Sequence, residues 1–173
     1  MIIAVEDFIR MVETDIPSDE LRSRLSGIET AIRKYTNNHF ILRGTEHEAE
    51  VRGGKIVLSS PFFLIGDTVE LQSEEYKDEV FTITDIDGFG LIVDEPLRFE
   101  GTYIMSLVKY PKDVVMGAVN LLKWDISNRE KIGVKSETIS RWSVTYYDMD
   151  SNALLGYPSS LLGFLKPYVK ARF

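Results

Sequence analysis

The chain has 173 residues, no cysteine and a formal net charge of −7 at pH 7. This length predicts one domain, or a small domain with an insertion, and 44% hydrophobic residues are enough to form a core without disulfides. The acidic excess argues against a chain that binds nucleic acid by neutralising phosphates. The lack of cysteine excludes disulfides, thiolate metal sites and cysteine nucleophiles.

The first 40 residues predict two amphipathic helices. Apolar residues recur every three or four positions from Val5 to Val12, and again from Leu21 to Tyr35. Ser18 is placed to cap the second helix, and Asn37-Asn38 is placed to end it. Each apolar stripe lies on one side of its helix, so both helices are expected to pack on a partner surface.

From Phe40 to Tyr110 the pattern changes to strands. Gly53-Gly54 and Asp87-Gly88 are typical of tight turns between alternating apolar and polar residues. Residues 103–108 form the last predicted strand before Pro111. Five or six short strands at this spacing predict a compact barrel or rolled sheet.

After Pro111 the apolar spacing predicts a third helix, which Gly133 ends. Residues 138–147 alternate in character and predict a strand or an extended arm. Pro158 introduces a short terminal helix over residues 161–165, before Pro167 and an aromatic, basic tail.

The predicted fold is therefore α+β: a small helical bundle of three main helices plus a short C-terminal helix, with an inserted all-β subdomain. Within the insert, residues 65–71 and 81–86 resemble strands of an SH3-like small barrel. Residues 1–40 and 111–173 would form the helical core with its arm and tail, and residues 41–110 the insert. The insert carries 14 acidic and 6 basic residues, so the negative charge of the chain belongs to it.

Few residues suggest catalysis, and we predict no catalytic, cofactor or metal site. His39 and His47 are the only histidines, and neither sits in a pattern typical of metal ligands. Asp85-Ile86-Asp87-Gly88 resembles the start of a calcium loop but lacks the later ligands, so a hairpin turn explains it better. A weaker alternative is a hydrolase whose pocket joins carboxylates among Glu79, Asp85, Asp94 and Glu95.

Two other features favour assembly. The arm holds Trp142 with Tyr146 and Tyr147, side chains that are common interface anchors, although Trp142 packing back on the helices is an equal alternative. The tail after Pro167 is of a kind that often stays loose until it docks on a partner, and simple fraying is the alternative.

Four segments of the chain have a familiar sequence pattern: residues 31–40, 111–124, 135–146 and 161–168. These segments resemble tailed-phage head–tail connector proteins, also called adaptors or head-completion proteins. The prophage members found in Bacillus and its relatives are the most similar. The usual glycine of the family's arm is Ser140 here, and short members lack the β insert.

The resemblance implies a structural, non-enzymatic virion protein at the head–tail interface, present in the host cytoplasm during assembly. Such proteins form a dodecameric ring on the portal protein, extend the DNA channel and offer a docking surface to a stopper or tail-completion protein. DNA would pass without specific binding, and no membrane or cofactor is involved. The implied portal-docking residues are Leu165, Pro167, Tyr168, Val169 and Phe173. The implied subunit-interface residues are Ile139, Trp142, Val144 and Tyr146.

A different class of function is the alternative to this reading. The β subdomain would then be a binding module on a helical base, and would recognise a peptide or glycan through loops such as residues 73–78.

Overall fold

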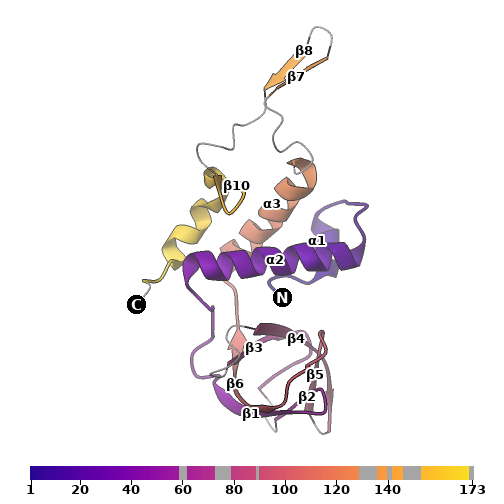
Figure 1. The fold of residues 1–173 in the computed structure, drawn as a ribbon, viewed down its shortest axis with the longest axis vertical. Coiled ribbons are helices and arrows are strands. Elements are labelled where there is room, and N and C mark those ends of the chain that lie inside the picture. Colours follow the sequence, from indigo (N-terminus) through magenta and orange to yellow (C-terminus); the bar gives the residue numbers. More distant parts are fainter. Residues whose placement is uncertain are drawn as a thin grey trace. The chain divides into compact units, whose positions relative to one another are not determined.

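A computed structural model describes residues 1–58, 62–72, 79–88, 90–128, 136–139, 142–145 and 153–171 (Figure 1). The chain divides into two compact units. The barrel unit consists of Met1 and residues 39–110, and the helical unit consists of residues 2–38 and 111–173. Each unit is described below by itself.

The barrel unit is a closed antiparallel barrel with the strand order β1-β2-β5-β4-β3-β6. Closure pairs β6 with β1, where Met105 lies opposite His47 and Gly101 opposite Val51. A register shift between Ile83 and Asp85 marks a bulge in the β4–β5 pair. The strands are β1 (His47–Arg52), β2 (Lys55–Val57), β3 (Thr68–Gln72), β4 (Glu79–Asp87), β5 (Gly90–Val93) and β6 (Gly101–Val108).

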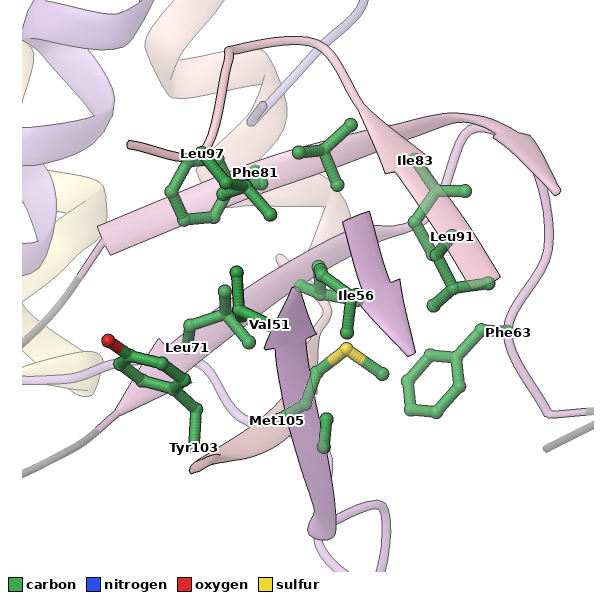
Figure 2. Packing of buried hydrophobic residues seen from close by; sticks show 13 residues of the cluster. Val51, Ile56, Phe63, Leu71, Phe81, Ile83, Leu91, Leu97, Tyr103 and Met105 are labelled. Atoms are coloured by element: carbon green, nitrogen blue, oxygen red, sulfur yellow. The ribbon is translucent and has the colours of Figure 1, made fainter. Parts of the chain in front are cut away.

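Local turn chemistry and alternation explain the barrel. Gly53 and Gly54 both have positive φ, which the two-residue turn joining β1 to β2 requires. Along β1, Ala49 and Val51 are buried while Glu48 and Arg52 face solvent. Thirteen such inward side chains fill the interior, and Figure 2 shows that they come from strands all around the barrel and from its loops.

The helical unit contains α1 (Val5–Met11), α2 (Ser18–Thr36), α3 (Lys112–Asn128) and the 3₁₀ helix η2 (Ser159–Tyr168). Arg24 on α2 donates a hydrogen bond of 3.0 Å to the buried carboxylate of Asp125 on α3. The ring of Phe164 on η2 packs directly against Gly117 of α3. A Cβ at this position would lie 2.2 Å from the ring, so the close contact requires glycine. The buried stripes of α2 and α3 are Leu21, Leu25, Ile28 and Ile32, and Val114, Ala118, Leu121 and Leu122.

The predicted helical bundle carrying an SH3-like insert is wrong as a description of this fold. The protein is a mixed α+β protein whose β part is a closed six-stranded barrel. Only α2 and α3 are long, with 19 and 17 residues, and they run in clearly different directions in Figure 1. The other two helical elements are a seven-residue α1 and a 3₁₀ helix, so the described residues do not form a set of long helices aligned side by side.

Three local predictions also need correction. Ser18 makes no side-chain cap; it is the first residue of α2, after Pro17. Residues 138–147, predicted as a strand or an extended arm, include parts of two paired strands, β7 (Ser136–Ile139) and β8 (Trp142–Thr145), with Ile139 paired to Trp142, whereas residues 140, 141, 146 and 147 lie outside the described residues. The short terminal helix is a ten-residue 3₁₀ helix that contains Pro167, and the two-residue strands β9 (Ala153–Leu154) and β10 (Tyr157–Pro158) precede it.

Candidate interaction surfaces

The loop between β2 and β3 exposes three large apolar side chains. Phe62, Leu64 and Ile65 are 70%, 64% and 62% exposed. Phe63, between them in sequence, is buried in the barrel core (Figure 2). Scattered single apolar residues are normal on a protein surface, but a continuous apolar patch commonly marks an interaction site. We call residues 62–65 the apolar loop.

Hydrogen bonds and ring contacts hold the apolar loop in place. The backbone N–H of Leu64 donates to Asp67 Oδ2 at 2.8 Å, and Gly66 donates to the carbonyl oxygen of Ile83 on β4. The imidazole of His47 stacks on Phe62 with 5.8 Å between ring centroids and meets Phe63 edge-on at 5.7 Å. Phe63 and His47 therefore contribute contacts that place residues 62–65 against the barrel.

Acidic residues adjoin, in the sequence, the residues that contact this loop. Glu46 and Glu48 adjoin His47 in the chain, and both are exposed. Asp67 ends the loop, and Asp85 lies two residues beyond its hydrogen-bonding partner Ile83. The apolar loop is thus set in the part of the chain that carries 14 of the 27 acidic residues.

The second candidate surface is the hairpin of β7 and β8, which we call the arm. Among the strands that the structure describes, these two pair only with each other (Figure 1). The register runs from Ser136 opposite Thr145 to Ile139 opposite Trp142. The predicted interface residues Ile139, Trp142 and Val144 lie on these strands, whereas Tyr146 lies outside the described residues.

The third candidate surface is the C-terminal segment, which is docked within its own unit. Lys170 N donates to the carbonyl oxygen of Thr36 at 2.7 Å, and the side-chain amide of Asn38 donates to the carbonyl oxygen of Tyr168. The Tyr168 hydroxyl lies 2.8 Å from both carboxylate oxygens of Asp113, and this hydrogen bond raises the pKa of Tyr168 above its ordinary value of 10.0. Residues 168–171 are therefore fastened to the end of α2 and the start of α3.

The predicted portal-docking residues take different positions in this segment. Leu165 is fully buried and belongs to the core of the helical unit. Pro167 and Val169 are exposed, Val169 by 49%, and Tyr168 is partly exposed. Phe173 lies outside the described residues. Only Pro167, Tyr168 and Val169 among these present surface to a partner in this conformation.

The carboxylates considered for hydrolysis are spread along the barrel. Glu79 and Asp85 are six residues apart on the extended strand β4, which separates them by about 20 Å. Asp94 Oδ1 accepts a hydrogen bond of 2.8 Å from the backbone N–H of Thr82. His39 lies 2.7 Å from the buried carboxylate of Glu70. Among the described residues no group of three or more His, Asp or Glu side chains is arranged to hold a metal ion.

Sequence reasoning missed the apolar loop. The run Phe62-Phe63-Leu64-Ile65 lies within residues 40–110, whose overall pattern predicts strands. Its lack of alternation was the available signal, because one apolar residue after another does not suit a strand with one solvated face. Which three of the four are exposed depends on how the loop closes over the barrel, and this is a tertiary property.

No protein-family model matches the chain, and a search of curated proteins finds no match. Among the described residues, no helix has the length and apolar character needed to cross a membrane.

Proposed function

We propose that this chain is a structural component of a phage head–tail connector, a ring of copies of this chain between the portal and the tail or stopper. The proposal begins with the sequence resemblance of the four segments described above. The structural observation that supports it best is the two-stranded hairpin of the arm. A lone two-stranded hairpin is marginally stable in water, so one that pairs with no other described strand needs a neighbour to pack on.

The charge distribution is compatible with this role. Residues 41–110 carry 14 acidic and 6 basic residues, and an acidic surface beside a channel would repel DNA and let it slide. Residues 111–173 carry 9 basic and 6 acidic residues, which suits contact with an acidic partner. A ring uses heterologous interfaces, so two different surfaces of one copy must be complementary.

The test is co-sedimentation with the portal protein encoded in the same gene neighbourhood. The proposal predicts a complex far larger than the portal alone. A neighbourhood without portal, capsid and tail genes, or a portal that never retains the chain, would overturn it.

Point variants then test the role of the C-terminal segment better than a truncation, because residues 170 and 171 hydrogen-bond to α2. Val169→Asp should reduce retention on the portal. Met11→Asp changes an equally exposed apolar residue on α1 and serves as the matched control. Equal retention of both variants would show that Val169 does not contact the portal.

A further inference from the structure

We propose that the end of the chain is a releasable strap that fixes both connections between the helical unit and residues 39–110 of the barrel unit. The strap consists of residues 166–171. While it is docked it holds the two connections in place, and its release frees both of them together. The strap acts within the isolated chain, so this role does not depend on the connector function.

The strap makes hydrogen bonds at both points where the chain passes between the units. At the first connection, the side-chain amide of Asn37 donates to the carbonyl oxygen of Ala171 at 2.8 Å. Asn38, the last residue before the barrel unit, donates in the same way to Tyr168 at 3.2 Å. At the second connection, the Tyr168 hydroxyl donates to Asp113, near the start of α3 and just after the barrel unit ends. One short segment therefore ties the two connections to each other.

The first connection also contains strained backbone that needs support from its surroundings. Asn37 and Phe40 have φ of 48° and 54°, which lie in the left-handed region. Asparagine tolerates this conformation, but a bulky residue such as phenylalanine rarely adopts it, and such residues are common at switch points. Lys109 N donates to the carbonyl oxygen of Phe40 at 2.9 Å, and the ring of Tyr110 lies 5.0 Å from that of Phe40. Movement at Phe40 therefore reaches the second connection, into which Lys109 and Tyr110 lead.

The strap can open without unfolding the helical unit, because it contributes little to the core. Leu162 and Leu165 of η2 are 3% and 0% exposed and anchor that element. None of the described residues from Lys166 onward is buried. The strap is held by the three side-chain hydrogen bonds above and by one from Lys170 N to the carbonyl oxygen of Thr36 at 2.7 Å. Each bond adds only modest net stability, so a segment held in this way opens locally at low cost.

Amide hydrogen exchange of a strap variant tests this role. Asn37→Gly with Tyr168→Phe removes one strap bond at each connection, and glycine retains the left-handed conformation at position 37. Exchange should rise about tenfold at residues 38–41 and 108–113, the change expected when opening is eased by about one hydrogen bond. Amides of β3 and of the middle of α2 should be unaffected. The decisive amide is Lys109, which donates to Phe40 and not to the strap.

The matched control is Ser127→Ala with Asn128→Ala, which removes two side-chain-to-backbone hydrogen bonds at the other end of α3. This control should leave exchange at both connections unchanged. A rise that is confined to the strap or to one connection, or that is equal in all elements of both units, would overturn the inference.

A reversible covalent bridge tests the opposite change. The natural chain has no cysteine, so Asn37→Cys with Ala171→Cys places the only two thiols on either side of one strap bond. A short bis-methanethiosulfonate reagent should join them and slow exchange at both connections, and a thiol reductant should reverse the effect. Each single-cysteine variant, treated with the same reagent, is the control. Equal exchange in the bridged and the reduced protein would show that opening of the strap does not govern the connections.

Discussion

The two units differ in how they expose apolar surface. In the barrel unit, three of four successive residues in one loop are more than 60% exposed, while their neighbour Phe63 fills the core. Among the described residues of the helical unit, the exposed large apolar residues are more dispersed: Ile9 and Met11 on α1, Met116 on α3, and Leu155 and Val169 near the C-terminus. Exposed apolar residues that adjoin one another can mark an interaction site, whereas single ones are normal on a protein surface. The barrel unit is therefore the one that exposes neighbouring apolar residues in a single loop.

The largest effect on stability is expected for substitutions in the apolar loop, where the buried Phe63 follows the exposed Phe62. Phe63→Ala should lower the free energy of unfolding by about 3–5 kcal/mol, because it empties a buried aromatic position. Phe62→Ala, one residue earlier, should cost less than about 1 kcal/mol, since the side chain is 70% exposed and its stacking contact with His47 lies at the surface. Urea unfolding of both variants measures the difference. Similar losses of unfolding free energy in the two variants would contradict the placement of Phe63 in the core and Phe62 at the surface.

The corresponding comparison in the helical unit uses the C-terminal segment. Leu165→Ala should cost about 2–5 kcal/mol, because Leu165 is fully buried. Val169→Ala, four residues later and half exposed, should change stability by no more than about 0.5 kcal/mol. Amide hydrogen exchange should locate the loss caused by Leu165→Ala in α2 and α3. Equal loss of protection in the barrel strands would contradict the division into two units.

Gly90→Ala tests the closest backbone approach in the barrel. A Cβ at position 90 would lie 2.5 Å from the carbonyl oxygen of Ile56, and backbone cannot move aside as a side chain can. We expect a loss of about 1–3 kcal/mol, typical of overpacking. Gly88→Ala is the matched control, since nothing lies within 4 Å of its Cβ position. Thermal unfolding of the two variants should separate them clearly, and equal midpoints would refute the tight β2–β5 contact.

The smallest effect concerns the hydrogen bond between Tyr168 and Asp113. This bond raises the folded-state pKa of Tyr168, so it favours the neutral phenol. Its contribution to stability is therefore complete below the ordinary value of 10.0 and is lost as the pH rises through the higher folded-state pKa. Tyr168→Phe should lower the unfolding midpoint slightly at neutral pH, with the difference from the natural chain shrinking in strongly alkaline solution. A difference that grows with pH would have the wrong sign.

Local chemistry made part of this structure predictable. The turn at Gly53-Gly54 was predicted correctly because two glycines between alternating strands demand positive φ at both positions. The end of α2 was also predicted, and Asn37 there adopts the left-handed conformation that asparagine tolerates. In both cases the signal lies within a few residues of the structure that it determines.

Features that depend on tertiary packing were not predictable in the same way. The periodicity of α2 and α3 says which face is buried but not at what angle the helices cross, so the bundle prediction was wrong. The alternation of residues 138–147 continues across the two residues between Ile139 and Trp142, which concealed the hairpin. The exposure of Phe62 and Leu64 depends on Phe63 occupying the barrel, which no local pattern of apolar residues encodes.

The most direct test of the connector role is a reconstruction of phage particles, or of portal complexes, that contain this chain. The account predicts a closed ring of copies of this chain between the portal and the tail. Particles whose head–tail junction is fully occupied by other proteins, with this chain absent, would contradict it.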